Sequence, residues 1–207
     1  MIKLKKKTII TIAITTGVFI GFCSFAFINL GKWLLVKDPL PEKLDMIFVF
    51  AGTSPLRELY GCQLLKRFSN SKIIISSPTE YKRVISWAVN DSVDTTRIQP
   101  FPVCRSTWKE LVALRIKLKS HSADNTLNVG LVSCPYHMRR IKIFSQSIFK
   151  KNFILHYLPV PFEKFPHPRE HFIHWWRRFH IIKYVFSEYS KIIIYIIPSI
   201  FHLIIKS

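Results

Sequence analysis

Four lysines stand among the first seven residues of the chain, and a run of 24 uncharged residues follows from Thr8 to Gly31. As a helix rising about 1.5 Å per residue, this run would reach roughly 36 Å, enough to cross a hydrocarbon core of about 30 Å. The run is apolar on every side, whereas a surface helix keeps one polar face. We therefore expect a transmembrane anchor over residues 8–36, preceded by a basic segment at residues 1–7.

The lysines ahead of the run indicate its orientation, because an excess of Lys and Arg marks the cytoplasmic end of a membrane helix. We expect the N-terminus in the cytoplasm and the remainder outside, although Lys32, Lys37 and Lys43 on the far side weaken the bias. An inverted topology is one alternative. Another is a cleaved signal peptide with its site at residues 24–26, but the apolar run exceeds the 7–15 residues typical of such peptides.

The chain carries 31 Lys and Arg against 12 Asp and Glu, a formal net charge of +19. Such a charge attracts anions, namely lipid head groups, phosphorylated substrates or nucleic acid. A domain outside the cytoplasm argues against nucleic acid, so we expect membrane lipid and an anionic small-molecule or lipid-linked ligand. Neither a G-x-G-x-x-G nor a Walker A pattern is present, so we expect no nucleotide cofactor. The four cysteines lack zinc-site spacing. A Cys104–Cys134 disulfide is possible if the domain lies outside the cytoplasm.

Short apolar runs alternate with helical patterns beyond a proline-containing linker at residues 37–43. This alternation predicts a Rossmann-like α/β domain over residues 44–161, a doubly wound and mainly parallel five-stranded sheet with helices on both faces. The expected strands are 46–50, 72–76, 97–99, 127–132 and 153–158. The expected helices run from Thr53 or Ser54 to 68, from 78 to 89, from Ser106 or Thr107 to 120, and from 135 to 149.

In such sheets ligands bind beyond the carboxyl ends of the strands. That rule selects the loops 51–57, 76–80 and 133–140 and the helix that starts near Thr107. In the last loop, a helix N-terminus offers unpaired N–H groups, while His137 and Arg140 share a helix face. The pattern favours a cradle for a phosphate or carboxylate. The alternative is a capping turn followed by a solvated basic helix.

Residues 132–141 read Val-Ser-Cys-Pro-Tyr-His-Met-Arg-Arg-Ile, and weaker motifs precede them in order. These are Phe50-Ala51-Gly52 with Arg57, Ile75-Ser76-Ser77, and Thr107-Trp108-Lys109-Glu110. Together, from Leu44 to Val160, they resemble the YdcF-like family of envelope proteins. The resemblance implies a Rossmann-like fold, a bacterial inner-membrane location and a role in envelope integrity or cell wall biogenesis. It implies no particular reaction.

The chain departs from the family pattern at four places. Ala51 replaces the first glycine of a pair, and Ser77 replaces the glycine that follows Ser76. The acidic residue usual shortly before Thr107 is missing, and Glu110 stands where an asparagine is common. Either Glu110 supplies the carboxylate of this site, or the chain is a non-catalytic member of the family.

From these patterns we expect Ser133 as nucleophile, His137 as base and Glu110 as acid. Three functions remain open: an envelope enzyme that acts on a phosphate-bearing precursor, a non-catalytic module that binds anionic lipid or a partner protein, and a cytoplasmic-facing nucleotide-binding domain. Convergence of the site residues around a concave pocket would favour the enzyme. The residues expected to bind ligand are Gly52, Thr53, Arg57, Ser76, Thr107 and Arg140.

Residues 162–207 form an aromatic, basic and apolar segment that we expect to be helical and close to the membrane. His167, His171 and His174 share a helix spacing and could hold a metal with Glu170. A membrane interface explains these rings more simply, so we expect no metal. The apolar tail at 192–205 would reach only roughly 21 Å, too short to span, and favours an interfacial or core-packing helix.

Overall fold

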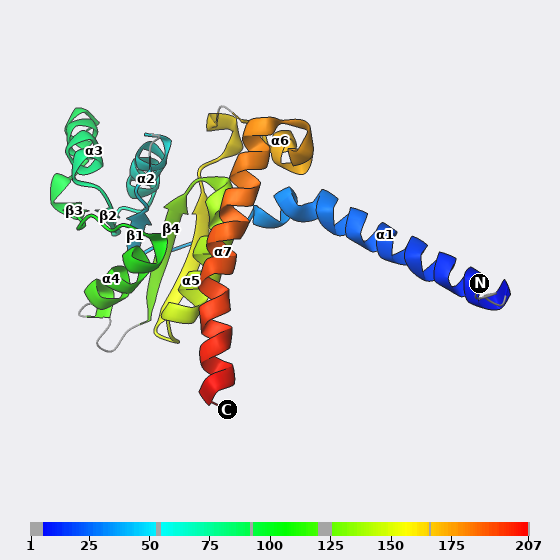
Figure 1. The fold of residues 1–207 in the computed structure, drawn as a ribbon. Coiled ribbons are helices and arrows are strands. Elements are labelled where there is room, and N and C mark those ends of the chain that lie inside the picture. Colours follow the sequence, from blue (N-terminus) through cyan, green and yellow to red (C-terminus); the bar gives the residue numbers. More distant parts are fainter. Residues whose placement is uncertain (1–5, 53–54, 92, 120–125, 166, 207) are drawn as a thin grey trace.

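The computed structural model describes residues 6–52, 55–91, 93–119, 126–165 and 167–206, with the side chains of 6, 78 and 198–206 left aside. Five parallel strands form a single sheet in the order β3-β2-β1-β4-β5, which confirms the predicted α/β fold (Figure 1). The strands are β1 (Met46–Val49), β2 (Lys72–Ile75), β3 (Ile98–Pro100), β4 (Leu127–Ser133) and β5 (Phe153–Pro159).

The central strands are apolar on both faces because helices cover both faces. Ile47 and Val49 point to one side, where they pack with α2 (Leu56–Arg67) and α3 (Pro78–Asn90). The alternate residues Met46 and Phe48 pack on the other side with α4 (Thr107–Lys119) and α5 (Met138–Ile148). The chain therefore crosses from one layer to the other between β3 and β4.

Serine side chains cap the starts of α3 and α4. The Ser77 side chain accepts a hydrogen bond from the backbone N–H of Glu80, and Ser106 accepts one from that of Lys109. Thr53 and Ser54, the expected caps of the first helix of the domain, lie outside the described residues, and Pro55 precedes α2. The helix expected from Pro135 begins with a short 3-10 turn, η2 (Pro135–His137), and continues as α5.

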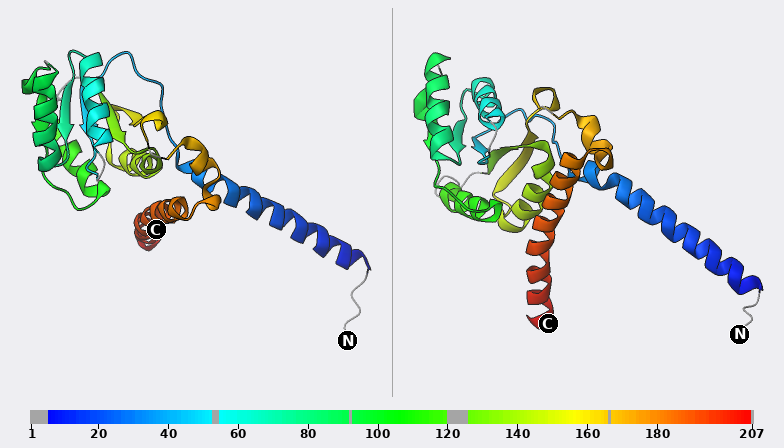
Figure 2. Two further views of the ribbon diagram at one scale, coloured as in Figure 1. Left: turned by 90° about the horizontal axis from the view of Figure 1, so that it is seen from above. Right: turned by 45° about the horizontal axis from the view of Figure 1, so that its top comes forward.

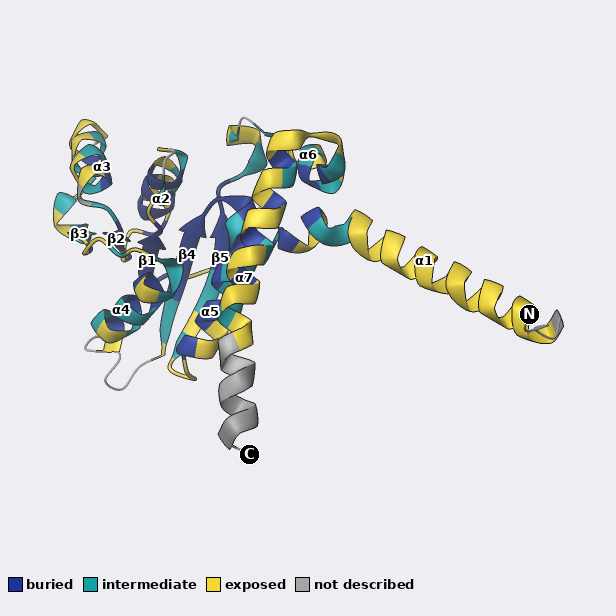
Figure 3. Ribbon diagram, viewed as in Figure 1, coloured by how far each residue is buried: buried dark blue, intermediate teal, exposed yellow. Residues whose placement is uncertain are grey.

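The N-terminal helix α1 (Lys6–Leu34) extends away from the α/β layers (Figure 2). Its apolar side chains are exposed along most of its length, in contrast to the buried strands (Figure 3). Among the described residues, α1 is the one helix long and apolar enough to cross a membrane. Only its final turns pack against the protein, where Leu34 is fully buried.

The C-terminal segment consists of helices, as expected, but the tail belongs to a longer element. Helix α7 (Phe179–Lys206) continues through Pro198, so the tail at 192–205 is its second half. Its first half packs beside α5, and Ile181 and Val185 join Leu34 and Trp175 in an apolar cluster. The remaining elements are η1 (Thr95–Arg97), η3 (Phe162–Lys164), α6 (Arg169–Ile173) and η4 (Trp175–Arg177).

Candidate functional site

A pocket of about 480 Å³ opens where β1 and β4 lie side by side. The chain leaves β1 towards β2 on one side and leaves β4 towards β5 on the other, so this is the switch point at which open α/β sheets bind ligands. The polar and charged residues that line the pocket are Arg57, Thr107, Glu110, Ser133, Tyr136, His137, Arg140, His167, Tyr184, Ser187, Glu188 and Lys191.

Arg57, on the first turn of α2, contacts the residues that follow β1 and β4. Its side chain is buried, with Nε donating to the sulfur of Cys134 at 3.0 Å and Nη1 donating to the carbonyl oxygens of Phe50 and Ala51. Gly52 leaves the space for it, because a Cβ there would lie 2.5 Å from Cζ of Arg57. This glycine is therefore needed for the close approach of the guanidinium to the loop.

Glu110 rises from the first turn of α4 into the same pocket. Its carboxylate accepts hydrogen bonds from the hydroxyl of Ser76 and from the backbone N–H of Ala51. Burial raises the pKa of Glu110 above its usual value, and these hydrogen bonds only partly oppose the rise. Glu110 thus holds its proton more tightly than an exposed glutamate does. Ser76 supports Glu110 from behind and does not itself line the pocket.

A network centred on Glu188 occupies the opposite wall. The carboxylate of Glu188 lies 2.9 Å from Nδ1 of His137, accepts from Nε of Arg140 at 2.7 Å, and pairs with Lys191 at 3.0 Å. Arg140 also donates through Nη1 to the hydroxyl of Thr107. Burial works against ionisation of Glu188, but its partners His137 and Arg140 outweigh burial and keep its pKa low. The carboxylate is therefore ionised at neutral pH.

Burial lowers the pKa of His137 to about 4, although Glu188 acts in the opposite direction. The ring is consequently neutral at pH 7. An ionised carboxylate can only accept a hydrogen bond, so Nδ1 of His137 carries the proton and donates a hydrogen bond to Glu188. Nε2 is then left as a proton acceptor. A carboxylate that orients a histidine in this way is the usual support of a general base.

Ser133 ends β4 at the bottom of the pocket and is buried. Its hydroxyl makes no hydrogen bond to His137, or to any other group in the part of the chain that the structure describes. The predicted nucleophile and base therefore line one pocket without touching. The backbone N–H of His137 already donates to the carbonyl of Cys134, so one donor of the expected anion cradle is used.

Most residues predicted from the sequence converge on this pocket, and the set that lines it is Gly52, Arg57, Thr107, Glu110, Ser133, His137 and Arg140. Thr53 lies outside the described residues. The sequence interpretation missed Glu188, which belongs to α7, beyond the predicted domain boundary at 161. One signal could have drawn attention to it, because Glu188 is the single acidic residue between positions 171 and 207.

The cysteines make no bridge. All four are described and are free thiols, and the sulfur of Cys134 faces the guanidinium of Arg57 rather than Cys104. A Cys104–Cys134 disulfide is therefore not formed in this structure.

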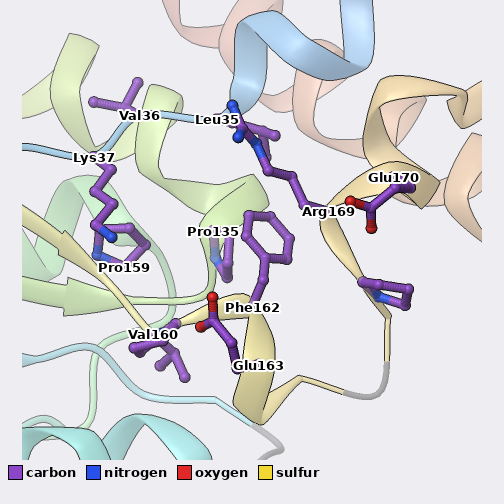
Figure 4. Close-up of a pocket in the computed structure, with 12 residues that line it drawn as sticks. Leu35, Val36, Lys37, Pro135, Pro159, Val160, Phe162, Glu163, Arg169 and Glu170 are labelled. Atoms are coloured by element: carbon purple, nitrogen blue, oxygen red, sulfur yellow. The ribbon is translucent and has the colours of Figure 1, made fainter.

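A second cavity, of about 690 Å³, lies between the end of α1, Pro135 and the C-terminal segment (Figure 4). Prolines and apolar side chains form much of its wall, and Arg169 extends across it towards Leu35 (Figure 4). None of the predicted site residues line it. The smaller pocket at the switch point therefore remains the candidate site.

Comparison with protein-family models, curated proteins and solved structures gives no match to this chain. Its function must therefore be inferred from the pocket itself.

Proposed function

We propose that this chain is a membrane-anchored YdcF-like protein of the bacterial cell envelope whose pocket binds an anionic, phosphate-bearing envelope precursor or lipid. The observation that carries the proposal is the arrangement of Arg57, Arg140 and Lys191 around one pocket at the switch point of the sheet. The order of the sequence motifs from Leu44 to Val160 supports the family.

The charges of the pocket favour an anion. Three cationic side chains line it against two carboxyls, and the burial of Glu110 favours its neutral form. Nη2 of Arg57 donates to no acceptor among the described residues, although Nε and Nη1 are both engaged. A guanidinium with an unused pair of N–H donors suits a phosphate oxygen. We therefore assign Nη2 of Arg57 as the primary ligand contact.

The same pocket holds the parts of an acid–base pair. Neutral His137 has Nε2 as a proton acceptor, and burial raises the pKa of Glu110, which favours the protonated form that a general acid requires. Two titratable groups whose pKa values are shifted in opposite directions are a common basis of acid–base catalysis. This favours processing of the bound ligand. The missing contact between Ser133 and His137 favours the second candidate, a non-catalytic module that binds an anionic lipid.

The sequence and α1 support a proposal for the location. One apolar helix of sufficient length stands at the N-terminus, and four lysines precede its uncharged core. We propose a single-pass protein of the inner membrane, with its N-terminus in the cytoplasm and its α/β domain outside. An anchored domain meets amphiphilic ligands at the membrane surface, which fits a lipid-linked phosphate.

A binding assay on the full chain in a nonionic detergent tests the ligand class. Decyl phosphate is titrated by calorimetry, with decyl glucoside as the neutral comparison and inorganic phosphate as competitor. Arg57→Lys keeps the charge but removes Nη2, so loss of one charge-assisted hydrogen bond should weaken decyl phosphate binding about tenfold or more. Arg97→Lys is the matched control, because Arg97 is a half-buried arginine that donates to backbone carbonyls away from the pocket.

Equal weakening in both variants, or equal affinity for decyl phosphate and decyl glucoside, would refute the proposal. Competition by inorganic phosphate would locate recognition in the head group, and failure to compete would show that the alkyl chain is also read. Release of phosphate from decyl phosphate then separates the two candidates. Turnover that disappears in His137→Gln supports the enzyme, whereas binding without turnover in the unchanged protein supports the module.

A further inference from the structure

Three histidines from separate parts of the C-terminal segment meet beside the pocket. His167 precedes α6, His171 lies within α6, and His180 lies in the first turn of α7. One ring nitrogen from each lies within 4.8 Å of the other two. The ring centroids of His167 and His180 are 4.6 Å apart. The ring centroid of His171 lies 6.2 Å from that of His167 and 6.3 Å from that of His180.

The sequence spacing had suggested a different set, His167, His171 and His174. Helix α6 ends at Ile173, so His174 leaves the shared face, and its ring packs edge-on against Trp176 at 5.6 Å. The chain then passes through η4, and His180 in the first turn of α7 supplies the third ring of the cluster. The cluster is thus a product of the tertiary fold and not of one helix.

Outside the cluster, the ring of His167 also lies 6.2 Å from that of Tyr184. Among the described residues, the three rings make no side-chain hydrogen bond or ion pair, and Nδ1 of His171 is buried without a hydrogen-bond partner. A buried polar atom left unpaired normally costs about 1–3 kcal/mol. Glu170, Arg177 and Arg178 lie beside His171 along a neighbouring cavity, and at the His171 ring the positive charge of Arg178 outweighs the negative charge of Glu170.

We propose that His167, His171 and His180 bind a divalent transition-metal ion, with Zn²⁺ as the first choice. Imidazole nitrogens are suitable ligands for Zn²⁺, and three of them leave the fourth tetrahedral position open to water or a ligand oxygen. With bonds of about 2.0–2.1 Å, two ligands of a tetrahedral Zn²⁺ stand roughly 3.4 Å apart, so ring nitrogens that lie up to 4.8 Å apart need to approach by up to about 1.4 Å.

The site is independent of the proposed function, since it rests on different residues. His167 nevertheless lines the candidate pocket, so a bound ion would sit at its rim. A cation there would add a further attachment point for an anionic ligand. Metal binding is measured directly and does not require phosphate binding to succeed.

The experiment uses the full chain in a nonionic detergent, purified through a tag without histidines. Zn²⁺ is titrated by calorimetry, and Co²⁺ serves as a visible-absorption probe of tetrahedral coordination. We expect one equivalent of metal in the unchanged protein. Because loss of an outer-shell partner alone costs a metal site about 10–100-fold in affinity, His180→Ala should weaken binding by at least about 100-fold. His180 is exposed, so its replacement disturbs no core.

His174→Ala is the matched control and should bind metal like the unchanged protein. His167→Gln provides a second loss-of-ligand variant, and melting curves without metal verify that each variant is folded. Equal losses in His174→Ala and His180→Ala would overturn the assignment. So would the absence of stoichiometric binding in the unchanged protein, or a Co²⁺ spectrum that remains octahedral.

Discussion

Glu188 pairs with two cationic side chains of the pocket wall. Its ion pair with Arg140 is largely buried, whereas its ion pair with Lys191 is half-exposed. Glu188→Gln leaves Arg140, whose side chain is only 11% exposed, without its counter-charge. Breaking such a pair should lower the free energy of unfolding by about 3–5 kcal/mol. Lys191→Gln removes a half-exposed partner of the same carboxylate, and should cost less than about 1 kcal/mol.

Thermal unfolding of both variants in detergent provides the comparison. If the two changes cost the same, Arg140 is not held by Glu188 in the way described. If Glu188→Gln costs nothing, the network around His137 is not formed.

Glu58 and Glu80 are two buried glutamates whose carboxyl groups interact with one another next to the loop of the candidate site. Glu80 accepts a hydrogen bond from the backbone N–H of Gly52, and one oxygen of each carboxyl is buried without a partner among the described residues. Burial raises the pKa of Glu58 to about 7, and the charge of Glu80 contributes to the rise. Glu58 is only 1% exposed, so solvent screens this effect little.

The folded state therefore binds more protons at Glu58 than the unfolded chain does between pH 4.5 and about 7. Stability is fullest below this window and falls as pH rises through it. Glu58→Gln should remove this loss, making the variant more stable than the unchanged protein above pH 7 by up to about 3 kcal/mol. At pH 5, close to the lower end of this window, the difference should shrink to less than about 1 kcal/mol.

Melting temperatures from pH 5 to pH 8 measure the effect. The exposed Glu163→Gln should keep the slope of the unchanged protein, because its carboxyl faces solvent. A Glu58→Gln variant that remains parallel to the unchanged protein throughout would contradict the raised pKa.

The site residues that the sequence predicted and those that it missed differ in how far apart they lie along the chain. His137 and Arg140 belong to one local motif after a strand, so strand-end reasoning identifies them. Arg140 reaches Glu188 across 48 positions, into a helix that pattern reasoning assigned to a separate segment. Glu80 meets Gly52 across 28 positions. Such contacts are fixed by tertiary packing and leave no local signal beyond an isolated acid in a basic, apolar helix.

The strands and most helices were predictable because each has a strong local signal. β1 and β2 are short apolar runs buried on both faces, and α3 starts at a serine followed by proline. Helix α6 was not predictable, because five residues carry too little periodicity to define its end. Helix α7 was underestimated because Pro198 normally disfavours a helix interior, yet the helix continues through it.

The end of α1 docks closely against the C-terminal segment. A Cβ on Gly31 would lie 2.2 Å from the carbonyl oxygen of Phe172 and 2.8 Å from the ring of Trp175. The indole N–H of Trp175 donates to the carbonyl of Phe27, and the hydroxyl of Tyr189 donates to that of Leu30. These contacts fix the end of α1 to the C-terminal segment, including α7, which supplies Glu188.

Gly31→Ala should therefore force the two elements apart and destabilise the docked segment by about 1–3 kcal/mol, the usual cost of overpacking. Gly21→Ala is the matched control, since a Cβ there meets nothing within 4 Å and lies in the same helix. Limited proteolysis within residues 162–178, with tryptophan fluorescence as the second readout, measures the difference. Equal protection of the two variants would show that α1 does not dock through Gly31.

The anchor, the α/β layers and the C-terminal helix form a connected whole. The apolar cluster of Leu34, Phe172, Trp175, Ile181 and Val185 joins α1 to α7, and Glu188 of α7 completes the candidate site. An α/β domain cut at residue 161 would lack that carboxylate. The pocket therefore stands in a fixed relation to α1, which suits the proposed ligand at a membrane surface.

The orientation of this assembly is tested by fusions to alkaline phosphatase, which is active only outside the cytoplasm, and to a reporter active only inside it. With the proposed orientation, in which the lysines before α1 favour a cytoplasmic N-terminus and α1 is the single span, phosphatase joined after Val160 and after Ser207 should be active in both cases. Replacing the lysines at positions 3, 5, 6 and 7 by glutamine should reduce that activity, since the bias then rests on Lys32, Lys37 and Lys43.

The two fusion points give different answers if α7 crosses the membrane, because activity after Val160 would then be lost after Ser207. Cytoplasmic signals at both points would overturn the proposed orientation altogether. The pocket would then face nucleotides and not wall or lipid phosphates, and the same Arg57→Lys and Arg97→Lys pair would be tested against a nucleoside phosphate.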